Sequence, residues 1–188
     1  MLFEAGRELM FGGHVSPSGA FVRHSTDDRD TVEVTPPIDE GTDAMLGRKT
    51  FSRVEVDHAR ASIDLQVAAY QKLVEAMSAA TSDTSVDTAR RAFEARFFNS
   101  LVLSLDRYFV HRIRPVTGKD GNPLNELEML CDSLMNREGV LQPSKVIKLV
   151  PEKSVTKVGF GVQIQLTEDQ FERLVAAFFA DLEAKFVE

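Results

Sequence analysis

The chain has 188 residues, which is enough for one domain with a hydrophobic core but short for two. Its net charge of -7 at pH 7 disfavours nonspecific binding to a nucleic-acid backbone by the molecule as a whole. No apolar run approaches the roughly 18 residues of a transmembrane helix, so we expect no membrane partner. The single Cys131 and the lack of a secretion signal favour a cytoplasmic location.

Residues 1–50 differ from the rest of the chain. They are rich in glycine and proline, and they carry an acidic stretch from Asp27 to Asp43. Low apolar density with net negative charge is typical of a segment without a packed core of its own. We therefore expect an irregular N-terminal arm over residues 1–50 and a single helical domain over residues 51–188.

The first helix is expected from about Phe51 to Ala80, where apolar side chains recur at helical spacing. A polar TSDTS turn follows, and a second helix is expected from Thr84 to Pro115. Because the turn is short, the two helices should pack as antiparallel neighbours. The second helix should begin with a capping box formed by Thr84 and Asp87.

The second helix is apolar on two adjacent faces, which is typical of a helix surrounded by other elements. The predicted buried positions are Val86, Ala89, Phe93, Phe97, Leu101 and Leu105 on the first face, and Phe98, Val102, Phe109 and Ile113 on the second. This helix is therefore predicted to be the centre of the fold.

A third helix is expected from Pro123 to about Arg137. Asn122 is a strong N-cap, and proline is favoured at the first helical position. Gly139 is the expected left-handed stop.

The apolar period then changes from helical spacing to alternation, which predicts a small β-hairpin or meander over about residues 146–166. Thr167 and Gln170 form a capping box for a last helix, expected from Thr167 to about Phe186. The predicted fold class is mainly all-α: an up-and-down bundle of about four long helices, with the hairpin before the last helix.

Residues 122–182 carry a family resemblance. The helix NPLNELEMLCDSLMNREGVL, a predicted hairpin ending GFGVQIQL and a capped amphipathic helix resemble the later part of HEPN-type helical domains and similar bacterial helical proteins. In the HEPN domains that cleave RNA, this helix carries an Arg, a neighbouring polar residue and, a few positions later, a His. The corresponding positions here are Cys131, Asp132 and Asn136, with Arg137 next in the chain.

The resemblance therefore implies a catalytically degenerate HEPN-like domain. Neither Cys131 nor Asn136 can supply the cation or the general acid and base that phosphodiester cleavage needs near neutral pH. We expect no catalytic residue and no cofactor. A purely structural interpretation stays open, in which Cys131 is a small buried residue and Asp132 is solvated.

Two other groups of residues are candidates for chemistry. Glu55 and His58 have the Glu-x-x-His spacing that places both side chains on one helical face, and antiparallel packing would bring His111 to the same end of the bundle. These three residues are candidate metal ligands, although they also fit an ordinary charged helix end. Candidate contacts to nucleic acid or phosphate are Arg107, Arg112, Arg114 and Lys119, although the helix dipole also favours cations at this end.

The sequence thus predicts a non-catalytic HEPN-like helical interaction module that works as a homodimer or with a protein partner. One alternative is an RNA-binding or ribonuclease-like protein with a degenerate active site. The other is a metal-binding helical-bundle enzyme that uses His58 and His111.

Overall fold

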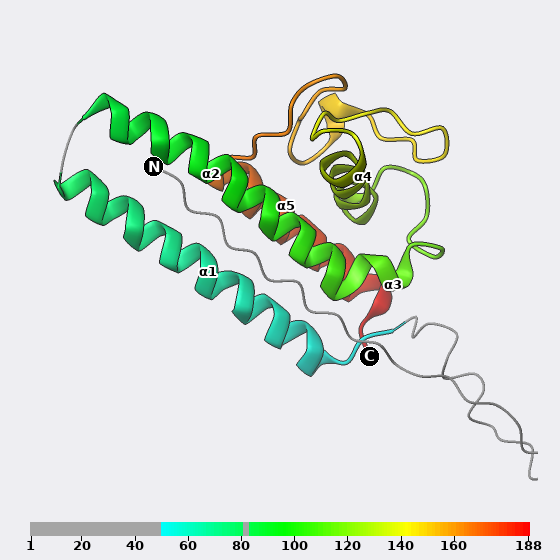
Figure 1. The fold of residues 1–188 in the computed structure, drawn as a ribbon. Coiled ribbons are helices and arrows are strands. Elements are labelled where there is room, and N and C mark those ends of the chain that lie inside the picture. The colour runs from blue at the N-terminus through cyan, green and yellow to red at the C-terminus, as the bar shows by residue number, and fades with distance from the viewer. Residues whose placement is uncertain (1–49, 81–82) are drawn as a thin grey trace, which may run out of the picture. The chain divides into compact units, whose positions relative to one another are not determined.

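The computed structural model describes residues 50–80 and 83–188 (Figure 1). The predicted N-terminal arm lies outside the described residues except for its last position, and it stays a prediction. The described part of the chain is mainly helical, and none of its helices is long and apolar enough to cross a membrane.

Helix α1, Arg53–Ala80, begins with a capping box that the sequence analysis did not identify. The Ser52 hydroxyl accepts a hydrogen bond from the Glu55 amide, and the Glu55 carboxylate accepts one from the Ser52 amide at 2.9 Å. The inward face of α1 follows the helical spacing seen in the sequence. Its buried residues are Val56, Ala59, Ile63, Val67 and Tyr70.

Helix α2, Thr84–Leu105, runs antiparallel to α1 (Figure 1). Its N-cap is Asp83, whose carboxylate accepts a hydrogen bond from the Ser85 amide at 2.7 Å, so the predicted cap at Thr84 is wrong by one residue. The difference has a physical reason. A carboxylate accepts the orphan amides of the first turn and also interacts favourably with the positive end of the helix dipole.

The helical path continues beyond α2 without a break. A π-helical turn, Asp106–Val110, leads into the short helix α3, His111–Ile113, so the path ends close to the predicted limit at Pro115. A π turn contains one more residue than an α turn and therefore rotates the side chains that follow it. Phe109, Val110 and Ile113 are buried after this rotation.

The buried face of α2 is narrower than predicted. Phe98, Leu101, Val102 and Leu105 are buried as expected. The other predicted positions of the first face are less buried than expected: Val86 and Phe97 are half-buried, and Ala89 and Phe93 are exposed. The reason is the position of the last helix. Its first residue, Glu168, donates its amide to the Glu94 carboxylate, so this helix does not cover the turns of α2 that precede Glu94.

Helix α4, Pro123–Asn136, begins as predicted, because the Asn122 side chain accepts a hydrogen bond from the Asn125 amide at 3.0 Å. Two consecutive residues end it in the left-handed conformation, Glu138 at a φ of 55° and Gly139 at 75°. Gly139 therefore belongs to the stop, as predicted, but a residue with a side chain shares the turn.

The predicted β-hairpin over residues 146–166 is not found, because these residues contain no strand. An antiparallel bridge joins Val140 to Gln163, and a one-turn 3-10 helix occupies Pro151–Lys153. Some backbone groups of this segment bond to side chains of α2 and α4, and others bond to backbone atoms, such as the Ile164 amide to the Gly139 carbonyl at 2.8 Å. Alternating apolar residues alone therefore did not lead to a β-ladder.

Asn99 of α2 takes the place of a neighbouring strand beside residues 164–166. Its side-chain nitrogen donates to the Ile164 carbonyl at 2.8 Å, and its side-chain oxygen accepts from the Leu166 amide at 3.4 Å. A side-chain amide offers the same donor and acceptor as a peptide group. The segment is thus held extended along α2 without a second strand.

Glu126 of α4 likewise bonds to the backbone of residues 155–156. Its carboxylate is 1% exposed and accepts hydrogen bonds from the Val155 amide at 2.8 Å, the Thr156 amide at 2.9 Å and the Thr156 hydroxyl at 2.6 Å. Burying a carboxylate is costly unless hydrogen-bond donors replace the lost water. These three hydrogen bonds hold the irregular segment against α4.

Helix α5, Glu168–Phe186, begins with the predicted capping box of Thr167 and Gln170. Its end is tied to the start of the domain, because the Phe51 amide donates to the Phe186 carbonyl at 2.7 Å. Phe51 also forms an isolated parallel bridge with Val187. The first and last described elements are therefore joined through their backbones.

The described helices pack around aromatic rings between α2 and α5. The ring centroids of Phe98 and Phe171 are 5.1 Å apart, and those of Phe109 and Phe178 are 5.9 Å apart, so α5 runs parallel to α2. Figure 1 shows α1 and α2 from the side but α4 nearly end-on, so α4 crosses them. The four helices are thus not strictly up-and-down, because residues 114–167 return the chain to the start of α5.

We expect the Phe98→Ala substitution to lower the free energy of unfolding by about 3–5 kcal/mol, because Phe98 is completely buried and its removal leaves a cavity. Phe93→Ala is the matched control on the same helix, since Phe93 is 47% exposed, and it should cost about 1 kcal/mol or less. Urea titration followed by circular dichroism measures both. Equal losses would contradict the packing described for α2.

We expect Glu126→Gln to loosen residues 155–156, because a carboxamide replaces one acceptor oxygen with a donor and leaves an amide or hydroxyl unsatisfied. The cost should be roughly 1–3 kcal/mol. Hydrogen exchange of the Val155 and Thr156 amides should accelerate in this variant. Glu128→Gln, two residues further along α4, is the control and should leave both amides protected. Unchanged exchange in Glu126→Gln would refute this account.

Candidate functional site

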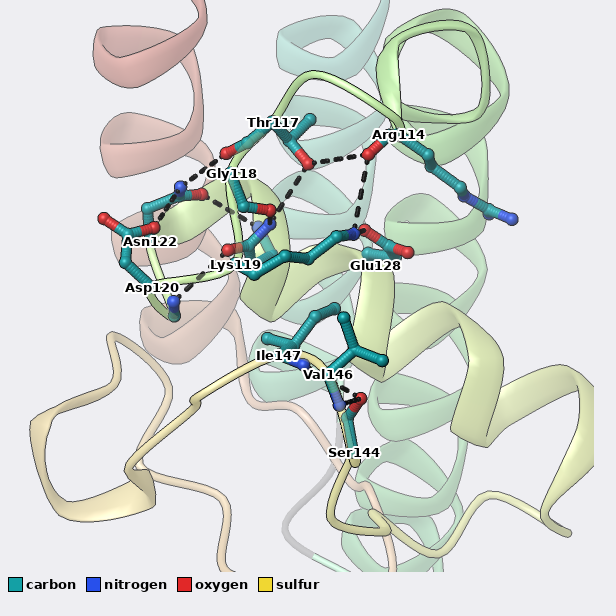
Figure 2. A network of polar contacts seen from close by, with 12 residues as sticks. Arg114, Thr117, Gly118, Lys119, Asp120, Asn122, Glu128, Ser144, Val146 and Ile147 are labelled. Carbon is teal, nitrogen blue, oxygen red and sulfur yellow. Dashed lines mark hydrogen bonds and ion pairs between the residues drawn. The ribbon is translucent and has the colours of Figure 1, made fainter.

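Several of the predicted site residues lie where the end of α2, the 114–122 loop and α4 meet (Figure 2). Gly121 sets the path of this loop. Its φ is 84°, and a Cβ atom there would lie 2.7 Å from the backbone oxygen of Lys148, which cannot move aside. The Lys148 amide also donates to the Lys119 carbonyl at 2.9 Å, so the loop is attached to the segment that follows α4.

Two asparagines hold the same loop closed. Asn125 is completely buried and donates to the Thr117 hydroxyl and the Gly118 carbonyl, both at 3.1 Å. Its oxygen accepts from the Gly121 amide at 3.2 Å. Asn122, which caps α4, donates to the Thr117 carbonyl at 2.7 Å. The loop is therefore fixed in place by the first turn of α4.

This loop places Lys119 over α4, as Figure 2 shows. The Lys119 Nζ atom lies 3.5 Å from Oε2 of Glu128 and 3.5 Å from the Arg114 carbonyl oxygen. Arg114 in turn pairs with Asp106 of the π turn at 2.7 Å. The two carboxylate side chains are 18% and 17% exposed, so solvent screens these attractions only partly. Both cations are therefore neutralised by acidic partners within the chain.

The other two predicted basic residues have different surroundings. The Arg112 guanidinium lies 4.5 Å from the centre of the Phe51 ring and 3.8 Å from the Glu55 carboxylate of α1. Nη1 of Arg107 lies 3.5 Å from Nε2 of His111. Only Arg114 and Lys119 are brought into contact with one another. The four predicted basic residues therefore do not form a single phosphate-binding cluster.

Cys131 faces the interior from α4. It is 3% exposed, and its thiol donates to the Val102 carbonyl at 3.5 Å. Burial raises the pKa of the Cys131 thiol well above its usual value, and the nearby negative charge of Asp106 acts in the same direction. The thiolate is the nucleophilic and metal-binding form of cysteine. This thiol therefore offers neither kind of chemistry at neutral pH.

The other three motif positions lie together on the exposed side of α4. The Asn136 side chain donates to the Asp132 carboxylate at 2.8 Å, and Nε of Arg137 lies 3.8 Å from the same carboxylate. Asp132 and Arg137 also line a hollow of about 320 Å³ between α4 and residues 142–147. The structure thus groups Asp132, Asn136 and Arg137 and leaves Cys131 on the buried side.

The hollow beside α4 is lined mostly by polar and charged side chains. Its ionisable lining residues are Glu128, Asp132, Arg137 and Lys145. Sequence reasoning missed Glu128, although its position four residues before Asp132 places both on one side of the helix. It also missed Lys145, whose place depends on the path of an irregular segment.

The three candidate metal ligands are not brought together. Glu55 is bonded to Ser52 in the capping box of α1, and His58 is exposed one turn later. Nδ1 of His111 lies 3.2 Å from the Asp106 carbonyl oxygen. Within residues 50–80 and 83–188, no three His, Cys, Asp or Glu side chains are grouped so that they could hold a metal ion.

Comparison of the chain with protein-family models, with curated proteins and with solved structures gave no match. What the site can do is therefore argued from its own residues. They provide hydrogen bonds and paired charges, and the described part of the chain groups no ligand set for a metal.

Iodoacetamide should alkylate Cys131 only when the protein unfolds, because burial keeps its thiol protonated and covered. We expect labelling of the native protein at pH 8 to be at least about tenfold slower than labelling in urea, as measured by intact mass. Asp132→Cys in a Cys131→Ser background is the matched control on the exposed side of α4, and it should react rapidly in the native state. Rapid native labelling of Cys131 would contradict its described burial.

Proposed function

We propose that this protein is a non-catalytic, HEPN-like helical interaction module that acts as a homodimer or through a protein partner. The proposal rests on the two residues that stand where RNA-cleaving HEPN domains have Arg and His. Cys131 is buried with its thiol protonated, and the Asn136 amide is bonded to Asp132. Neither residue can transfer a proton or supply a positive charge to phosphate near neutral pH.

The charge distribution near α4 supports binding to protein rather than to nucleic acid. A nucleic-acid site needs cations that are available to neutralise phosphates. Arg114 and Lys119 are already paired with Asp106 and Glu128, and the chain as a whole carries a net charge of -7. RNA binding by Arg114 or Lys119 would therefore require these ion pairs to open first.

A cleavage assay on a labelled pool of single-stranded RNA tests the proposal. We expect no cleavage by the wild-type protein or by Asn136→Ala. Asn136→His should also be inactive, because Cys131 still occupies the Arg position. An active HEPN ribonuclease assayed in parallel shows that the conditions support cleavage. Robust wild-type cleavage that disappears in Asn136→Ala would make the protein a ribonuclease with an unusual site and would overturn the proposal.

A further inference from the structure

The hairpin of α1 and α2 has an apolar surface that no other described element covers. Leu65 is 72% exposed, and Leu73 and Phe93 are each 47% exposed. Alanines with exposed side chains lie between them along both helices. We call this surface the hairpin face, and it consists of Leu65, Ala69, Leu73 and Ala76 of α1 and Ala89, Ala92 and Phe93 of α2.

The residues of the hairpin face lie side by side because the register of the two helices is fixed. The Tyr70 ring of α1 stacks on Phe97 of α2 at 5.3 Å and on Phe93 at 6.4 Å between centroids. Near the other end of the hairpin, Glu55 lies 3.8 Å from Arg112. Both sets of contacts fit one antiparallel register, which places Leu73 at the level of Phe93.

The hairpin face points away from α5. Gln71 of α1 donates to the Glu168 carboxylate at 2.7 Å, and the Glu168 amide donates to Glu94 of α2 at 3.2 Å, so these two side chains mark the side of the hairpin that α5 covers. Successive helical residues point about 100° apart. Leu73 therefore points away from the side that Gln71 marks, and Phe93 is turned about 100° from Glu94, so neither side chain lies on the side that α5 covers.

The margins of the hairpin face carry cations. Lys72 on α1 and Arg96 on α2 are exposed on opposite sides of the hairpin face, and neither forms an ion pair within the described part of the chain. The acidic Asp87 and Glu94 of α2 pair with Arg90 instead, away from this margin. Two unpaired cations thus flank an exposed apolar face on a chain with a net charge of -7, and the exposed Glu75 lies one turn from Lys72.

We propose that the hairpin face binds an amphipathic helix of a partner protein that has carboxylates on both margins of its apolar side. Two antiparallel helices form a groove that accepts the apolar side of a third. Leu73 and Phe93 would contact that side, while Lys72 and Arg96 would pair with the flanking carboxylates. This inference rests on the proposed interaction function, and it adds the surface and the chemistry of the partner.

The same observations argue against two other occupants. Exposed aromatic rings can stack on nucleic-acid bases, but here Phe93, Phe97 and Tyr70 stack on one another at interplanar angles of 16–25°, which leaves fewer free ring faces. A second copy bound through the same face would place the positive margins of both copies against each other. That contact would bring like charges together.

Fluorescence anisotropy with two labelled peptides tests the proposal on the full chain. The acidic peptide is a helix of about 20 residues, with leucines on one side and glutamates on both margins. The basic peptide has lysines in place of the glutamates. We expect the acidic peptide to bind the wild-type protein with a dissociation constant in the micromolar range. The basic peptide should bind at least about tenfold more weakly.

Charge reversal makes the test specific to the hairpin face. The double variant Lys72→Glu with Arg96→Glu should lose at least about tenfold in affinity for the acidic peptide and should gain affinity for the basic one. Lys153→Glu reverses an exposed cation elsewhere on the chain and is the matched control, so it should change neither affinity. Thermal melting shows that all three proteins are folded before binding is compared.

Several results would overturn the inference. These are equal binding of both peptides, failure of the double variant to change either affinity, or a preference for single-stranded RNA over the acidic peptide. A dimer in sedimentation velocity that Phe93→Glu dissociates would identify a second copy as the occupant. Tighter peptide binding after removal of residues 1–45 would identify the chain's own N-terminal segment as the occupant.

Capture experiments separate this inference from the proposed function. If the wild type and the double variant retain the same partners from the native cell, the interaction function stands and the hairpin face is rejected. RNA cleavage by the wild-type protein would instead reject the proposed function, whatever the peptides do.

Discussion

The packing of aromatic rings between α2 and α5 is the interaction on which the rest of the described structure depends. Phe98 of α2 and Phe109 of the π turn that continues it meet Phe171 and Phe178 of α5, and this pairing makes the two helical paths parallel. Parallel neighbours cannot be joined by a short turn, since the chain must return along their whole length. Residues 114–167, with α4 at their centre, make this return. The crossing of α4 over α2 thus follows from the direction of α5.

The return path is stabilised by side chains that bond to backbone groups, and not by regular sheet. Asn125 closes the loop before α4, Glu126 holds the amides of residues 155–156, and Asn99 holds the Ile164 carbonyl and the Leu166 amide. All three are presented by helices, which fix their positions. Buried backbone groups must find partners, and these side chains provide them where strands are absent. A long irregular segment can therefore be well ordered.

Helix positions were predictable from sequence where the signal is local. Asn122 before Pro123 and Thr167 before Gln170 set two helix starts through neighbouring residues, and the spacing of Asp132 and Asn136 indicated that these side chains could meet. The hairpin was predicted wrongly because the alternation in VQIQL does not reveal that Asn99, far away in sequence, satisfies its backbone. The pairing of Lys119 with Glu128 was missed for the same reason, since it depends on how the loop folds.

The place of α5 also has a consequence for the growing polypeptide. Phe98 and Phe109 are covered by residues 171–179, which are synthesised much later. Until those residues leave the ribosome, α1 and α2 can pair, but the central rings of α2 have no partner from α5. Exposed aromatic surface on a partly made chain favours aggregation and chaperone binding. The nascent chain is therefore most vulnerable in the interval between the synthesis of α2 and the docking of α5.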